Sequence, residues 1–197
     1  MPKIVDHETR RREIATALWR VVRRHGVEGA TVRAVAAEAG CSPSALRHYF
    51  VTQDELLTFT MRLVAENAHA RIAALPDIAD PSGRAERVLS ELLPLDDERR
   101  TETHVWIAFN ARALVDPKIR TIRDSTYDAI RDLCRKLVVD LTPATGARLD
   151  LLARQLNVLL DGLALHAALR PDLWSPRQVR AVLRHHLDAL SSTSPGG

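Results

Sequence analysis

Cysteine is scarce in this sequence: the 197 residues include only Cys41 and Cys134, which lie far apart in the chain. The two form no C-x-x-C pair, so we expect neither a disulfide framework nor a zinc site. Long apolar runs are also missing, and without about eighteen consecutive apolar residues we expect no transmembrane helix and no membrane partner. The first residues, MPKIVDHETRRRE, contain no apolar segment of the kind that secretory signals carry. Together these absences fit a protein of the reducing cytoplasm.

The motifs of common enzyme classes are missing as well. The sequence contains no H-E-x-x-H, no G-x-S-x-G and no P-loop, and neither cysteine lies in a recognisable activating setting. His185 and His186 are adjacent, and because neighbouring side chains on a helix point about 100° apart, the two cannot bind one metal ion together. We therefore expect no catalytic residues, no metal and no cofactor, although an all-α enzyme remains a competing class of protein.

Period-two alternation, the mark of a half-buried strand, is also absent, and nearly every segment has the helical period instead. This predicts an all-α fold of about nine helices: a small three-helix head, a long connecting helix and a larger helical body. We expect the head at 1–52, the body at 53–190 and a disordered tail at 191–197. The expected helices are 8–25, 31–39, one that starts at Pro43, 52–74, 84–93, 97–115, 117–140, 145–170 and 175–190.

Capping residues predict where the helices of the head begin and end. Thr31 suits the N-cap of the second helix, and Gly40 ends that helix. Ser42 suits the N-cap of the third helix, with Pro43 at its first position. The run Thr52 to Glu55 has the sequence of a capping box, which predicts the start of the long connecting helix.

Positive charge is concentrated in the first quarter of the chain. The net charge of the whole chain is only +3, but residues 1–50 hold nine Lys and Arg against five Asp and Glu. The remaining residues hold nineteen against twenty. This distribution is typical of a small anion-binding module on a nearly neutral body, although an offset of a few charges also arises by chance.

The stretch TVRAVAAEAGCSPSALRHYF, residues 31–50, meets the demands of a helix-turn-helix. Counted from Val32, Ala36 stands at position five, where the close approach of the neighbouring helix requires a small residue. Gly40 stands at position nine, where the turn requires a left-handed backbone. An ordinary αα-corner would need only the glycine and some apolar residues, so the full pattern favours DNA binding. The residues expected to build the wedge between the two helices are Val35, Cys41, Leu46 and Tyr49.

The third helix is expected to enter the major groove of DNA. Arg47 is the strongest candidate for a base contact, because its planar guanidinium can bind O6 and N7 of guanine, and a phosphate contact is the alternative. Ala45 could contact a thymine methyl group. His48 is either a DNA contact or a histidine of the helix surface, and Tyr49 could place its ring in the wedge with its hydroxyl outward. The predicted DNA-binding residues, including those whose hydroxyls or guanidinium suit phosphates, are Thr31, Arg33, Ser42, Ser44, Ala45, Arg47, His48 and Tyr49.

The run TVRAVAAEAGCSPSALRHYFVTQDELL resembles the TetR family of bacterial transcriptional regulators. The family pattern is roughly T-x-R-x-I-A-x-x-A-G-V-S-x-G-x-L-Y-x-Y-F-x-x-K-x-x-L, and the similarity covers residues 10 to 57. The segments around Trp106 to Phe109 and from Leu163 to Leu190 look similar to the BetI-type C-terminal subgroup. The resemblance implies a DNA-binding domain at 1–52 and a ligand-binding and dimerisation domain at 53–190. It also implies a ligand-responsive repressor that binds a palindromic operator as a homodimer.

Four positions depart from the family pattern. Cys41 stands where Val is usual, which is a tolerable exchange of small apolar residues. Ser44 replaces the usual Gly, Arg47 replaces the usual aromatic residue, and Gln53 replaces the usual Lys. These departures put the preferred DNA sequence in doubt, and a helical adaptor or ligand-binding protein of the same fold that does not bind DNA specifically is the alternative function.

A dimer is expected because one short helix cannot supply specific affinity for DNA alone. The last two long helices carry broad apolar stripes, and in the resembled family such a pair forms a four-helix bundle with its twin. The alternative is that both stripes face the core of one chain. The predicted interface residues are Leu156, Leu159, Leu160, Leu163, Val182, Leu183 and Leu187.

The resemblance also implies a pocket in the body for an unidentified small-molecule effector. A few polar groups on an apolar lining is the usual composition of such a site. For the aromatic candidates core packing is the alternative, and for the polar candidates on the penultimate helix interhelical hydrogen bonding is the alternative. The predicted ligand-binding residues are His104, Trp106, Phe109, Asn110, Asn157, Asp161 and His166.

Overall fold

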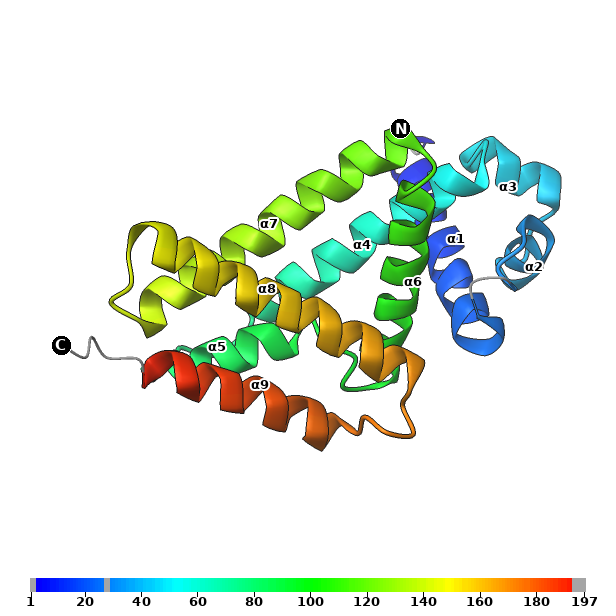
Figure 1. Cartoon of the computed structure of the whole chain (residues 1–197). Helices are drawn as coiled ribbons and strands as arrows, with labels where there is room; N and C mark the ends of the chain where they lie inside the picture. The colour runs from blue at the N-terminus through cyan, green and yellow to red at the C-terminus, as the bar shows by residue number, and fades with distance from the viewer. Residues whose placement is uncertain (1–2, 27–28, 193–197) are drawn as a thin grey trace. The chain divides into compact units, whose positions relative to one another are not determined.

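The computed structural model describes residues 3–26 and 29–192, and every regular element in these ranges is an α-helix (Figure 1), as predicted. Residues 193–197 of the predicted disordered tail lie outside the described ranges, and Ser192 is the C-cap of the last helix. No described helix is both long enough and apolar enough to span a membrane. The helices are α1 (Lys3–His25), α2 (Val32–Glu38), α3 (Pro43–Tyr49), α4 (Gln53–Ala73), α5 (Pro81–Ser90), α6 (Asp97–Ala113), α7 (Pro117–Leu141), α8 (Gly146–Leu169) and α9 (Pro176–Ser191).

The chain forms two compact units. We call Met1–Asn67 with His104–Arg120 the head unit, and Ala68–Thr103 with Thr121–Gly197 the body unit. The head unit contains α1 to α3 with parts of α4, α6 and α7, and the body unit contains α5, α8 and α9 with the remaining parts of those three helices.

The core of the head unit is built where α1, α2 and α3 pack on one another (Figure 1). Ile14 and Leu18 supply the apolar stripe of α1, and both are buried as the helical period predicts. Val35 and Ala36 of α2 are fully buried beside them, and Leu46 closes the core from α3. Of the residues that the spacing assigns to the wedge, Val35 and Leu46 are buried, whereas Cys41 and Tyr49 are only partly buried.

The turn between α2 and α3 is a Schellman motif. Gly40 has a φ of +65°, which an L side chain rarely adopts, and its N–H donates to the carbonyl of Ala37 at 3.1 Å. The N–H of Cys41 donates to the carbonyl of Ala36 at 2.9 Å. Ser42 then caps α3 by accepting from the N–H of Ala45, just as Thr31 caps α2. The roles of Thr31, Gly40 and Ser42 were predicted from the sequence, whereas the hydrogen bond from Cys41 was not.

The start of α4 differs in one detail from the capping box that the sequence predicts. The hydroxyl of Thr52 accepts from the N–H of Glu55 at 3.0 Å, as expected. The carboxylate of Glu55, however, accepts from the N–H of Val51 at 3.0 Å rather than from Thr52. The carboxylate thereby also fixes the residue that follows Phe50 at the end of α3.

Buried aliphatic side chains form the core of the body unit, in which α9 packs on α5 and on α8 (Figure 1). A complete capping box opens α9: the hydroxyl of Ser175 accepts from the N–H of Gln178, whose side chain accepts from the N–H of Ser175. Pro176 at the first position favours a helix start at this point. The boundary of α9 is thus set by local hydrogen bonds.

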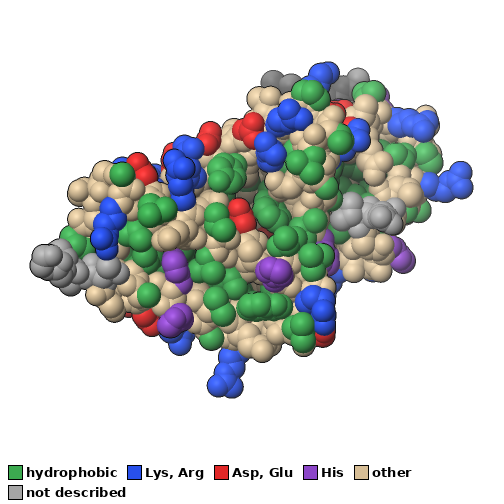
Figure 2. All heavy atoms as spheres, in the orientation of Figure 1, with side chains coloured by type: hydrophobic (Ala, Val, Ile, Leu, Met, Phe, Trp, Pro, Cys, Tyr) green, Lys and Arg blue, Asp and Glu red, His purple; other side chains and the backbone are tan. Residues whose placement is uncertain are grey.

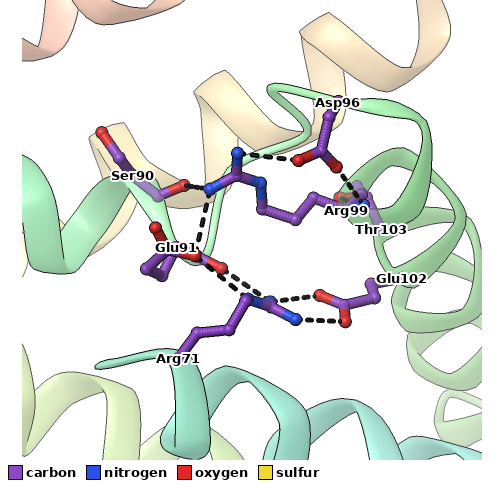
Figure 3. A network of polar contacts seen from close by, with 7 residues as sticks. All are labelled: Arg71, Ser90, Glu91, Asp96, Arg99, Glu102 and Thr103. Atoms are coloured by element: carbon purple, nitrogen blue, oxygen red, sulfur yellow. Dashed lines mark hydrogen bonds and ion pairs between the residues drawn. The ribbon is translucent and has the colours of Figure 1, made fainter. Parts of the chain in front are cut away.

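A network of charged side chains lies inside the body unit (Figure 3). The guanidinium of Arg71, near the end of α4, donates two hydrogen bonds to Glu102 of α6 at 2.8 and 2.7 Å, and one each to the carboxylate and the carbonyl of Glu91 at 3.0 Å. Arg99 bridges Glu91 and Asp96. Burial raises the pKa of Glu102, and the hydrogen bonds from Arg71 oppose this rise. The network therefore joins α4 and α6 to the segment after α5 through charges that are partly removed from water.

We predict that Arg71→Met destabilises the protein by about 3 kcal/mol, because it leaves the buried carboxylate of Glu102 without its cation. Urea unfolding followed by circular dichroism measures this loss. Arg135→Met is the matched control, since Arg135 pairs with Asp150 on the open surface and such pairs contribute at most about 1 kcal/mol. Equal losses for the two variants would show that the network contributes no more than a surface pair.

Candidate nucleic-acid interface and ligand site

The side chains predicted to read DNA lie on the outer surface of α3 and the turn before it. Ser44, Arg47 and His48 are exposed, whereas Ala45 is half-buried and Leu46, on the opposite side of α3, is buried. Thr31, Arg33 and Ser42 are exposed as well. Within the described residues the structure gives neither Arg33 nor Arg47 an ion pair, so both guanidinium groups are available to an anion.

Arginines of α1 hold α2 in place. Arg20 and Arg24 both bind the carboxylate of Glu38, the last residue of α2, with N–O distances of 2.6 and 2.8 Å. The hydrogen bonds from Arg20 and then Arg24 hold the pKa of Glu38 below its usual value. Arg10 donates to the carbonyl of Ala39 at 3.1 Å, which satisfies a backbone group at the end of α2.

A second arginine contact fixes the end of α3. The guanidinium of Arg11 lies 4.7 Å from the ring centroid of Phe50 and 4.6 Å from that of Phe59. Its neighbour Arg12 pairs with Glu66 of α4 at 3.1 Å. The basic excess of residues 1–50 is therefore largely used within the protein, so it is weaker evidence for a nucleic-acid partner than the composition suggests.

A cluster of rings at the end of α3 was not predicted from the sequence. His7 of α1 lies 5.0 Å from Tyr49 and 6.3 Å from His48, measured between ring centroids. Tyr49 is half-buried in this cluster, while Phe50 is buried in the core beneath it. The sequence indicates the ring contacts of His7 only weakly, because the helical period predicts only that one face of α1 packs against the head.

A cavity of about 750 Å³ lies in the head unit between α1, α4 and α6. Its wall is mostly aliphatic, with Leu18, Leu57 and Val105 among the lining residues. Asp54 and Arg112 also line it, and they pair through two hydrogen bonds of 2.9 and 2.8 Å. The volume falls within the range of small-molecule sites, but the polar groups in its wall already bind one another.

The predicted ligand residues do not gather around this cavity. Phe109 is buried, in agreement with core packing, the alternative prediction for this residue. The side-chain amide of Asn110 donates a hydrogen bond to the carbonyl of Trp106 at 2.8 Å. His104 and Trp106 are half-buried on the same helix. The other three candidates, Asn157, Asp161 and His166, belong to α8 in the body unit, where His166 stacks on Trp174.

Asn157 and Asp161 form a polar pair one helical turn apart on α8. The amide of Asn157 donates to the carboxylate of Asp161 at 3.3 Å. Asn157 is only 2% exposed, and its Oδ1 has no hydrogen-bond donor within the described residues. Burial raises the pKa of Asp161 to about 6. The nearby thiol of Cys134 is buried too, and burial together with the charge of Asp161 raises its pKa to about 12.

Most of the predicted dimer residues lie on the buried sides of α8 and α9, not on their exposed faces. Five of the seven, Leu156, Leu160, Leu163, Leu183 and Leu187, are buried in the core of the body unit, so they have no surface to offer a second copy. Core packing was the alternative prediction for this broad apolar stripe, and these five residues do pack in the core. Leu159 is half-buried and Val182 is exposed. The apolar residues that α8 does expose are Leu151, Val158, Leu165 and Leu169.

The two capped short helices, the left-handed turn and the exposed side chains of α3 define a helix-turn-helix DNA-binding protein. Family comparison agrees with this class. Residues 14–58 match the model described as bacterial regulatory proteins of the tetR family, and residues 81–192 match the C-terminal domain of BetI-type transcriptional repressors. The chain belongs to the TetR family of transcriptional regulators and carries a C-terminal domain of the BetI type, so it is not an enzyme.

Relatives and solved structures resemble the chain over nearly its whole length. It is 40% identical to the regulator PksA of Bacillus subtilis, with 96% of this chain and 94% of PksA covered. It is 30% identical to BetI of Burkholderia lata, covering 96% and 98% of the two chains. A transcriptional regulator from Rhodococcus has a TM-score of 0.81 at 34% identity, covering 91% and 95%. A regulator from Saccharomonospora viridis, solved in complex with choline, has a TM-score of 0.81 at 25% identity, covering 90% and 95%.

We predict that Asp161→Asn stabilises the protein above pH 6 and has little effect at or below pH 4. In the folded protein the carboxyl group has a pKa of about 6, which is above its value in the unfolded chain. Ionisation of the group therefore opposes folding once the pH exceeds about 4, and the full loss of stability is present above pH 6. Because the group is partly exposed, we expect a gain on the order of 1–2 kcal/mol at pH 7.5. Thermal unfolding at pH 4 and pH 7.5 measures it, and a gain that is the same at both pH values would contradict the assignment to ionisation.

Proposed function

We propose that this regulator is a ligand-responsive repressor of the bacterial cytoplasm, which binds a palindromic operator as a homodimer and releases it when a small effector binds. The observation that carries the DNA-binding part is the presentation of Arg47, an exposed guanidinium without an ion pair, on a helix whose opposite side is buried. We place the functional boundary between the DNA-binding and effector domains after residue 52.

The proposed DNA contacts divide into two kinds. Ser44, Ala45, Arg47 and His48 occupy the outer face of α3 and would lie against base edges in the major groove. The remaining four predicted residues, Thr31, Arg33, Ser42 and Tyr49, would bind phosphates and so fix the register of α3 in the groove. The hydroxyls of Thr31 and Ser42 already accept a backbone hydrogen bond, but each can still donate to a phosphate oxygen.

The dimer is supported by the exposed apolar residues of the last two helices. Leu151, Val158 and Leu165 recur at intervals of seven residues along α8, which places them on one stripe. Val182 is the exposed apolar member on α9, and Figure 2 shows hydrophobic side chains and histidines on the surface over α8 and α9. Stripes of this kind are unfavourable in water and pair well with a second copy. We therefore propose a four-helix interface built on this face instead of the buried leucines.

The effector site is proposed on α8 at Asn157 and Asp161. The choline complex of the relative from Saccharomonospora viridis supports a small organic cation as the type of ligand. A half-buried carboxylate with no cation beside it is the matching feature of this chain. A ligand that binds one conformation better than the other would shift the chain toward it, and α4, which continues from the head unit into the body unit, could carry the change to the DNA-binding domain.

A gel-shift assay with the DNA upstream of its own gene tests the DNA-binding proposal. We expect a specific shift that weakens steeply as the salt concentration rises, because phosphate contacts release counterions. If neither this DNA nor any neighbouring promoter gives a specific shift, the helical adaptor becomes the better description.

Arg47→Ala is predicted to cost roughly 1–3 kcal/mol of operator binding through one base pair in each half-site. The reason is that the guanidinium can make a bidentate contact with one guanine. Binding measured on operators with single substitutions shows whether discrimination at that base pair is lost. Arg33→Ala serves as the comparison, since loss of a phosphate contact weakens binding to all sequences alike. Uniform weakening by Arg47→Ala would make it a phosphate contact too.

Val158→Arg is predicted to convert the dimer to a monomer, because it places two like charges in an apolar interface. Sedimentation velocity at micromolar concentration measures the change. Val139→Arg is the control, since Val139 is an exposed valine on α7, a helix that is not part of the proposed interface. A wild-type protein that is already monomeric under these conditions would refute the dimer.

A further inference from the structure

Two hydrogen-bond acceptors of different charge lie together on α8, and the neutral one is unsatisfied within the described residues. The Oδ1 of Asn157 is buried and receives no hydrogen bond within the described residues, while its amide group donates to Asp161. Asp161 is half-buried, and the amide of Asn157 is the one donor that the structure gives it. A buried acceptor without a donor is unfavourable, and a carboxylate without a cation in an apolar setting is more so.

The groups around Asn157 and Asp161 supply neither the missing hydrogen-bond donors nor a positive charge. Cys134, on α7, is the nearby titratable group, and its thiol stays protonated at neutral pH. The described residues hold no group of three or more His, Cys, Asp or Glu side chains that could bind a metal ion. Magnesium would require a nearly complete octahedron of oxygen ligands, which one carboxylate and one amide oxygen do not provide. The site therefore lacks hydrogen-bond donors and positive charge.

The composition of the body unit restricts which cation can fit. A quaternary ammonium ion has no N–H group, and proteins usually hold it against several aromatic faces. The described part of the body unit contains two aromatic residues, Tyr127 and Trp174. Trp174 stacks on His166 and Tyr127 is about half exposed. A carboxylate without a cation, beside an amide oxygen without a donor, matches an ammonium group that carries N–H bonds better than one that is fully methylated.

We propose that the effector of this regulator is a primary or secondary ammonium compound, whose N–H groups donate to the carboxylate of Asp161 and to Oδ1 of Asn157. This inference rests on the proposed effector site and narrows its ligand class. Choline, the ligand of the relative from Saccharomonospora viridis, is a quaternary ammonium ion, so this chain would differ from that relative in the head group that it accepts.

Isothermal titration of the full chain at pH 8 with two matched pairs of probes tests the proposal. Ethanolamine and choline share one skeleton and one charge and differ in whether nitrogen carries hydrogens or methyl groups. Hexylammonium and hexyltrimethylammonium make the same comparison with an apolar tail. We expect the N–H member of at least one pair to bind ten times more tightly or better than its methylated partner. Equal or reversed preference in both pairs, or no binding by any probe, overturns the proposal.

Two variants locate the binding at the pair. Asp161→Asn keeps the shape of the side chain but removes its charge, and it should weaken binding of the preferred ammonium probe at least tenfold. Asp150→Asn, which neutralises an exposed carboxylate on the same helix, should change nothing. Undiminished affinity in Asp161→Asn overturns the proposal. The proposal is also overturned if Asp161→Asn becomes monomeric in sedimentation, because the carboxylate would then serve the dimer interface.

Gel shifts on the same samples separate this inference from the proposed function. Wild-type protein that binds its operator and releases it with choline, but not with the N–H probes, would retain the repressor function and refute the ligand class. Loss of operator binding on addition of an N–H probe, absent in Asp161→Asn, supports both.

Discussion

The orientation of the DNA-binding helix depends on how α2 is held against α1, where Val35 and Ala36 are buried and a carboxylate pairs with arginines of α1. Glu38 ends α2, and two arginines from the adjacent helix α1 bind it at once. Because the turn at Gly40 joins α2 to α3 with little freedom, fixing the end of α2 against α1 also fixes the direction of α3. The outer face of α3 then points outward, and within the described residues the structure gives its Arg47 no ion pair. A helix of seven residues could not hold this direction alone, since isolated helices of that length are marginal in water.

The local structure of the head could be predicted from the sequence, because it depends on residues that act over a few positions. Thr31, Gly40 and Ser42 set their helix boundaries through hydrogen bonds to backbone groups three to five residues away. The contacts of the α1 arginines could not be predicted in this way. Arg20 meets Glu38 across eighteen residues of sequence, and no periodicity indicates which surface arginine will find which carboxylate.

The body unit shows a different limit. Leucines occur on both the buried and the exposed sides of α8, so the helical period identifies an apolar helix but not the direction in which each leucine points. The structure assigns Leu156 to the core and leaves Val158, only two residues later, 68% exposed. That assignment depends on where α5, α7 and α9 lie, which is tertiary information. The same holds for Asn157: its spacing from Asp161 predicted the pair, but only packing reveals that its oxygen has no partner.

The internal use of the α1 arginines also bears on how the protein searches a genome. A head that presents few unpaired cations displaces few counterions from DNA of arbitrary sequence, so each encounter with such DNA is brief. Brief encounters leave more of the protein unbound. They also make the ratio of the affinities for operator and for bulk DNA depend on the small number of contacts that α3 makes with bases. In this chain the α1 arginines that pair within the head are less available to phosphates, so we expect shorter encounters with DNA of arbitrary sequence.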